Sequence, residues 1–142
     1  MQKISDRNQR IKDEILKNKF FRVAREQMFL SDHEVRMGAV MVINSKVYYS
    51  SHNRRNKTHP LIVLHYPEFV QSIHAELNAL IKYNEVRFGK LPKGTSMYVY
   101  REDRAGNVKL SKPCKTCQKL MRTAGIKRVF YSTETGTKME VL

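Results

Sequence analysis

The stretches His74-Ala75-Glu76 and Pro113-Cys114-Lys115-Thr116-Cys117 decide how this 142-residue sequence is interpreted. His74, Cys114 and Cys117 offer an imidazole and two thiolates, which are preferred ligands of zinc. Three protein ligands leave the fourth corner of a zinc tetrahedron open for water, as in catalytic sites. Glu76 is placed to face that water rather than to bind the metal, so it is the candidate for proton transfer. The spacing therefore predicts a catalytic Zn²⁺ site.

The same residues allow other interpretations. A Cys-x-x-Cys pair also occurs in redox sites and as half of a structural zinc site. The chain has only two cysteines, so a closed structural site would need another ligand from its remaining histidines, which are His33, His52, His59 and His65. A His-x-Glu followed by a Pro-Cys-x-x-Cys is nevertheless the signature of zinc deaminases that act on nucleobases. Ligand number, ligand type and the non-ligand Glu76 together favour the catalytic interpretation.

The length suits a single domain with one sizeable core. We expect residues 1–12, which are mostly polar, to be a flexible lead-in and residues 13–142 to form the domain. No apolar run reaches membrane-spanning length, and the N-terminus lacks the apolar region of a signal peptide. Cysteines used as metal ligands indicate a reducing compartment. The sequence thus predicts a cytoplasmic protein that does not contact the membrane.

The most unusual bulk property is the formal net charge of +14. A large positive excess favours polyanionic partners, of which nucleic acid is the obvious one. The segment from Arg104 to Arg128 contains eight Lys or Arg residues and no acidic residue. The candidate nucleic-acid contacts are Arg54, Arg55 and Lys57 in a polar loop, together with Lys109 and Lys115. If both segments flank the zinc, they would form a basic channel for a phosphate backbone.

Hydrophobic periodicity predicts alternating helices and strands. We expect helices over 13–30, 74–88 and 114–124, a hairpin of strands 37–43 and 47–49 around Asn44-Ser45, and strands over 97–100, 126–131 and 139–142. Few residues separate the last two strands, so they must be antiparallel neighbours. Alternation should place Tyr98 and Tyr100 on one face of their strand, with Met97 and Val99 on the other.

This order of elements, with its His-Ala-Glu helix and its Pro-Cys-x-x-Cys helix, resembles the cytidine deaminase superfamily over roughly residues 13–142. The stretches 74–80, 111–117 and 125–129 are similar to deoxycytidylate-deaminase-like proteins. The resemblance implies a three-layer α/β/α fold with a mixed five-stranded sheet whose last two strands are antiparallel. It also implies that Asn53 holds the sugar, and that the amide of Ala75 and the carbonyl of Lys112 read the base.

The expected activity is zinc-dependent hydrolytic conversion of cytosine to uracil. The number of cations favours a single-stranded nucleic acid substrate, with DNA preferred, because one phosphate does not need so many. One alternative is a deaminase of free deoxycytidylate or cytidine, in which one or two of these cations bind a single phosphate. Another alternative is a non-catalytic zinc module that binds nucleic acid. Assembly into an oligomer is compatible with the resemblance.

Overall fold

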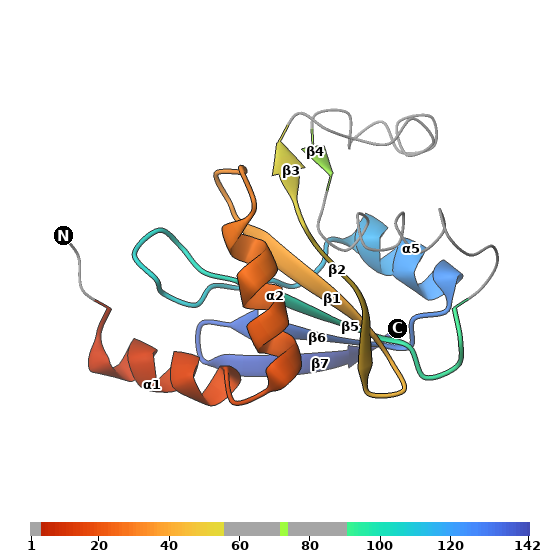
Figure 1. The fold of residues 1–142 in the computed structure, drawn as a ribbon, viewed down its shortest axis with the longest axis horizontal. Coiled ribbons are helices and arrows are strands. Elements are labelled where there is room, and N and C mark those ends of the chain that lie inside the picture. Colours follow the sequence, from red (N-terminus) through yellow and green to blue (C-terminus); the bar gives the residue numbers. More distant parts are fainter. Residues whose placement is uncertain (1–3, 56–71, 74–90) are drawn as a thin grey trace.

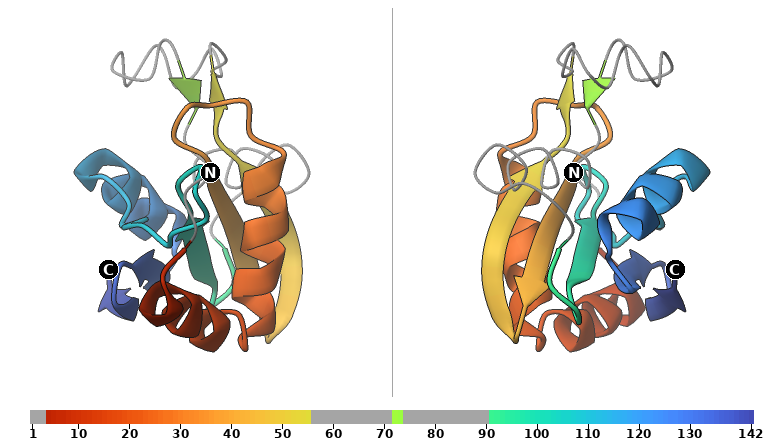
Figure 2. Two further views of the ribbon diagram at one scale, coloured as in Figure 1. Left: turned by 90° about the vertical axis from the view of Figure 1, so that its left-hand side faces the viewer. Right: turned by 90° about the vertical axis from the view of Figure 1, so that its right-hand side faces the viewer.

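The computed structural model describes residues 4–55, 72–73 and 91–142. Its centre is a mixed five-stranded sheet of order β2-β1-β5-β6-β7, with helices on both faces (Figure 1). The strands are β1 (Met37–Ile43), β2 (Lys46–His52), β5 (Ser96–Arg101), β6 (Arg128–Thr133) and β7 (Gly136–Val141). Helices α1 (Asp6–Ile15) and α2 (Lys19–Phe29) cover one face, and α5 (Lys115–Ala124) covers the other (Figure 2). The predicted three-layer α/β/α fold is confirmed.

Strand directions also follow the expectation. Strand β1 runs antiparallel to both β2 and β5, whereas β5 and β6 are parallel. The last pair, β6 and β7, is antiparallel, as the short connection required. In the β1–β2 turn, Asn44 and Ser45 have φ of 52° and 62°, which are the left-handed values that a two-residue hairpin turn needs.

Side chains of β5 divide between two apolar clusters, one on each face of the sheet. Tyr98 and Tyr100 pack with residues of α1 and α2, while Met97 and Val99 pack with residues of α5. This is the alternation that the sequence predicted. Close contact on the first face depends on Gly38, because a Cβ atom there would lie 1.8 Å from the carbonyl oxygen of Ala24. Glycine thus lets α2 approach the backbone of β1.

The N-terminal segment differs from the prediction. Residues 6–12 belong to helix α1 rather than to a flexible lead-in, and the single helix expected over 13–30 is two helices. The division falls at Asn18, whose side-chain oxygen accepts hydrogen bonds from Phe20 N at 2.8 Å and Phe21 N at 3.2 Å. Asparagine is among the strongest N-cap residues, so it begins a new helix within a continuous amphipathic pattern. No helix in the described residues has the length and apolar character needed to cross a bilayer.

Smaller differences concern strand ends. Strand β6 begins at Arg128 instead of residue 126, and β7 begins at Gly136 instead of residue 139. Val108 adds an isolated antiparallel bridge to Glu102, outside the five strands of the sheet. Helix α5 ends as predicted at Gly125, whose φ of 104° permits a left-handed cap.

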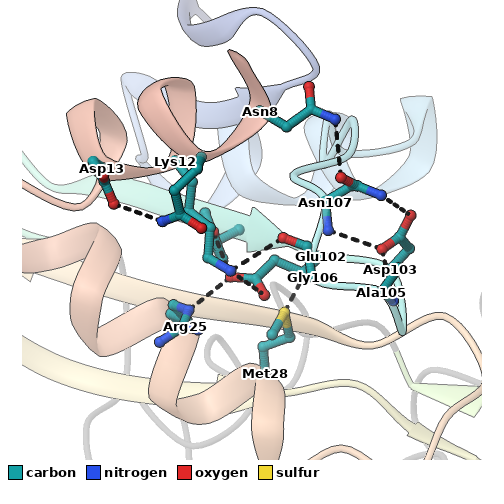
Figure 3. A network of polar contacts seen from close by, with 12 residues as sticks. Asn8, Lys12, Asp13, Arg25, Met28, Glu102, Asp103, Ala105, Gly106 and Asn107 are labelled. Carbon is teal, nitrogen blue, oxygen red and sulfur yellow. Dashed lines mark hydrogen bonds and ion pairs between the residues drawn. The ribbon is translucent and has the colours of Figure 1, made fainter. Parts of the chain in front are cut away.

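Helix α1 is held to the sheet by the buried carboxylate of Glu102, just after β5 (Figure 3). One oxygen lies 3.3 Å from Lys12 Nζ, and the other lies 2.6 Å from Arg25 Nε. Tyr100 donates its hydroxyl to the same carboxylate at 2.6 Å. Burial raises the pKa of Tyr100 and the Glu102 carboxylate raises it further, so the phenol keeps its proton for this bond. One acidic group therefore joins both N-terminal helices to the central strand.

The Glu102→Gln substitution is expected to lower the free energy of unfolding by about 3 kcal/mol, because it leaves two cations without a charged partner in a buried place. Urea denaturation with an unchanged m-value would measure the loss. The matched control is Glu14→Gln, which breaks an ion pair with Lys17 whose side chains are about three-quarters exposed (73% and 74%). Solvent screens such an exposed pair, so its loss should change stability much less than the loss of Glu102. Equal effects of the two variants would contradict the role given to Glu102.

Candidate metal centre

Strands β2, β5 and β6 point in the same direction, so their carboxyl ends meet at one edge of the sheet, here called the carboxyl edge. Asn53 follows β2 directly at this edge, and the segment that leads to Cys114 returns to it after β5. In α/β sheets, ligands bind outside the carboxyl ends of the strands. The carboxyl edge is therefore where the predicted site residues should meet.

The two cysteines lie at the start of α5. Cys114 is the N-cap, and its sulfur accepts a hydrogen bond from Cys117 N at 3.4 Å. Cys117 is fully buried in the apolar cluster beneath α5, whereas Cys114 is exposed, and the two form no disulfide. Cysteine binds metals through its sulfur as the thiolate, and a helix N-terminus is a place where negative charge is favoured. Two thiols on one helical turn thus fit the cysteine half of a zinc site.

The other half of the predicted site, His74, Ala75 and Glu76, lies outside the described residues. The preceding residues are described: strand β4 (Ser72–Ile73) pairs with β3 (Arg54–Arg55), with Ile73 opposite Arg54. The residue before His74 therefore lies beside the residue after Asn53. No group of three potential metal ligands occurs within segments 4–55, 72–73 and 91–142.

Asn53 is 6% exposed, and its side chain is firmly held. Its Oδ1 accepts hydrogen bonds from Met37 N at 2.9 Å and from Ser31 Oγ at 2.6 Å. Its Nδ2 donates to the carbonyl oxygen of Val35 at 2.6 Å. No sequence pattern pointed to Ser31 as a partner, because the contact joins residues 22 positions apart. The side chain predicted to hold the sugar is therefore fixed in orientation.

Two lysines of the acid-free segment 104–128 have acidic partners: Lys109, a predicted nucleic-acid contact, and Lys112, whose carbonyl is predicted to read the base. Lys109 Nζ lies 3.3 Å from Glu134 and 3.9 Å from Asp103, and Lys112 Nζ lies 2.8 Å from Glu140. The hydrogen bond and charge of Glu140 raise the pKa of Lys112. Asp103, Glu134 and Glu140 lie outside the acid-free segment 104–128. The composition of that segment therefore overstated how much of its positive charge is unpaired in the fold.

The other predicted nucleic-acid contacts differ in exposure, and the structure describes only some of their side chains. Lys115 is exposed in the first turn of α5, directly after Cys114. Arg54 is half-buried in β3. The side chain of Arg55 and all of Lys57 lie outside the described residues. Among the candidates whose side chains are described, Lys115 is exposed and lies next to the predicted metal ligand Cys114, whereas Arg54 and Lys109 are half-buried.

This architecture is that of an α/β domain with a mixed sheet and with paired cysteines at the start of the helix that follows the carboxyl edge. The model of one family, described as the cytidine and deoxycytidylate deaminase zinc-binding region, matches residues 12–133. The chain belongs to this family. No curated protein sequence gives a significant match.

Solved structures show the same fold. A cytidine deaminase from Burkholderia pseudomallei has a TM-score of 0.62 at 18% identity, covering 87% of this chain and 90% of that one. A dCMP deaminase from the cyanophage S-TIM5, in apo form, has a TM-score of 0.58 at 22% identity, covering 82% and 81%. The same cyanophage enzyme in complex with dCMP and dUMP has a TM-score of 0.57 at 21% identity, covering 82% and 79%.

Proposed function

We propose that this protein is a zinc-dependent hydrolytic deaminase that converts cytosine to uracil in a free nucleotide or nucleoside, with deoxycytidylate or cytidine as the substrate. The observation that supports the proposal is the placement of three segments: α5, with Cys114 at its start, follows the loop at the carboxyl edge; Asn53 follows β2 at the same edge; and Arg54 pairs with the residue before His74. Family membership supports the reaction class.

In this proposal, His74, Cys114 and Cys117 hold Zn²⁺. The metal, when bound, supplies a water activated for attack on the carbon that bears the exocyclic amine. Glu76 would move two protons in turn: the first from the water to the ring nitrogen as the new C–O bond forms, and the second from the newly bound oxygen to the exocyclic amine as the C–N bond breaks and ammonia leaves. The amide of Ala75 and the carbonyl of Lys112 hold the polar edge of the base.

Asn53 contributes as a hydrogen-bond donor. Its oxygen already accepts bonds from Met37 N and Ser31 Oγ, and one of its two amide hydrogens is given to Val35 O. A side-chain amide carries two donors, and the second N–H has no hydrogen bond to the described residues, so it is the group that we assign to the substrate. Asn53 therefore suits an oxygen acceptor such as a sugar hydroxyl oxygen.

The ion pairs of Lys109 and Lys112 favour a small substrate. A channel for a nucleic acid strand needs several cations available to phosphates, and both of these are already close to carboxylates. A mononucleotide needs one or two, which Lys115 or Arg54 can supply. The neighbouring cyanophage structure holds dCMP and dUMP, which agrees with this choice.

Single-stranded nucleic acid, DNA before RNA, is the second candidate substrate. The formal charge of +14 favours it, because a mononucleotide leaves most of that charge unused. A strand would be required rather than a duplex, since pairing hides the amine.

Deamination of dCMP and of a cytosine-containing single-stranded DNA oligonucleotide, measured side by side at matched low salt, separates the two substrates. We expect conversion of dCMP and little conversion of the oligonucleotide, because Lys109 and Lys112, two cations of the segment proposed to follow a phosphate backbone, are already paired with carboxylates. Oligonucleotide binding should then be weak and depend little on salt. Conversion confined to the oligonucleotide, with a steep loss of affinity as salt rises, would establish the second candidate instead.

A further inference from the structure

Two fully buried serines connect the segment before the cysteines to the sheet. Ser111 Oγ lies 2.8 Å from the carbonyl oxygen of Val99 and 2.8 Å from Ser132 N. Ser132 Oγ lies 2.8 Å from the carbonyl oxygen of Lys109, and Arg101 N donates to it at 3.2 Å. Both serines have 0% exposure, so none of these bonds is shared with bulk water. Together they join β5, β6 and the loop that leads to Cys114.

The two serines lie where strands β5 and β6 separate. The parallel pairing of β5 and β6 ends at Val99 and Tyr131, so the strands separate just beyond this point. Residues 109–111 lie between the separated ends: Lys109 N donates to Arg101 O at 3.0 Å, and Ser111 N donates to Ser132 O at 3.0 Å. Beyond this point β5 and β6 no longer hydrogen-bond to each other. The two serine hydroxyls form hydrogen bonds with the backbone of these strand ends and of the loop instead. The loop is thereby fixed between the two strand ends.

Little freedom remains between Ser111 and the first cysteine. Only Lys112 and Pro113 intervene; Lys112 is ion-paired with Glu140, and proline has a fixed φ. Gln118 Nε2 donates to the carbonyl oxygen of Pro113 at 2.8 Å, which ties this short link to α5. The position of Ser111 is therefore transmitted to Cys114 through a nearly rigid connection.

We propose that Ser111 and Ser132 are positioning residues that set the geometry of the Cys114 and Cys117 ligand pair through the loop wedged between β5 and β6. The inference rests on the proposed zinc-dependent function, but it concerns metal binding rather than turnover. Outer-shell groups that orient metal ligands typically change metal affinity by about 10- to 100-fold when removed. An effect of that size is expected here, although neither serine contacts the metal.

The test compares Ser111→Ala and Ser132→Ala with Thr95→Val as the matched control. Thr95 is 1% exposed, and its hydroxyl donates to Pro92 O at 2.6 Å, at the edge of the sheet where β5 begins. All three variants lose a buried hydroxyl, but only the serine variants disturb the loop to the cysteines. Zn²⁺ affinity is measured by competition with a chromophoric chelator, and Co²⁺-loaded proteins report the thiolate ligand geometry through their absorption spectra.

The expected result is zinc binding weaker by about 10- to 100-fold in both serine variants and an altered Co²⁺ spectrum, with Thr95→Val close to the wild type in both readouts. Unchanged affinity in the serine variants, or an equal loss in Thr95→Val, would overturn the proposal. Failure of both serine variants to fold, with Thr95→Val folded, would assign the pair to fold stability alone and also overturn it. Absence of zinc binding by the wild type would refute the proposed function itself.

Discussion

Deamination is expected to fall by about 10²- to 10⁴-fold or more in the Glu76→Gln variant, while bound zinc stays at the wild-type level. A glutamine side chain matches glutamate in size but cannot accept the proton that the attacking water must lose. Because Glu76 is not expected to be a ligand, the metal should remain. Steady-state conversion of dCMP to dUMP, together with zinc content by atomic emission, measures both quantities on one preparation.

Glu14→Gln is a suitable control for this experiment, because Glu14 lies exposed on α1, on the face of the sheet opposite the cysteines. It should retain both activity and zinc. Wild-type turnover in Glu76→Gln would refute the catalytic role. If neither the wild type nor the Glu76→Gln variant deaminates cytosine, but both bind zinc and nucleic acid, the chain is a non-catalytic zinc module. Loss of zinc in Glu76→Gln would show that the carboxylate is a ligand.

The Cys117→Ala variant should lose nearly all of its bound zinc and, with it, the part of its stability that depends on the metal. A ligand present at 1,000 times its Kd stabilises the folded state by about 4 kcal/mol, which corresponds to roughly 10 °C in Tm for a domain of this size. Wild-type protein should therefore melt about 10 °C lower after treatment with a chelator. The Tm of Cys117→Ala should not respond to the chelator.

Met121→Ala provides the matched control, since Met121 is fully buried in the same cluster, four residues along α5. Its loss leaves a larger cavity, so Tm should fall, but zinc content and the response to chelator should persist. Cys117→Ala with normal zinc content would contradict the assignment of Cys117 as a ligand. Chelator-insensitive melting of the wild type would show that metal binding and folding are not coupled.

Local patterns in the sequence predicted the elements of this fold well. The Asn44-Ser45 turn, the division of β5 between two faces and the Gly125 helix end each depend on residues close together in the chain. The break at Asn18 was missed because its flanking apolar residues continue one helical period, and only the capping bonds show where α2 begins. A capping residue inside an amphipathic pattern was the available signal.

Contacts between distant segments could not be predicted in this way. Glu102 meets Arg25 across 77 positions, and Ser111 meets Ser132 across 21. Lys109 and Lys112 were counted as part of a basic segment, although their carboxylate partners lie beyond its ends. These pairings depend on which strands become neighbours, and composition carries no information about that order.

The sequence by itself determined the chemistry proposed for this protein: residue types and spacing at His74, Glu76, Cys114 and Cys117 predict zinc ligands and a proton carrier, because ligand preference is a property of the side chains. Only the tertiary structure decided how the surroundings act on that chemistry. It turned Asn53 into an oriented donor, paired Lys109 and Lys112 with acids, and fixed the approach to Cys114 through two buried serines. The physical reason is that orientation, charge pairing and burial arise from contacts between segments that the fold brings together.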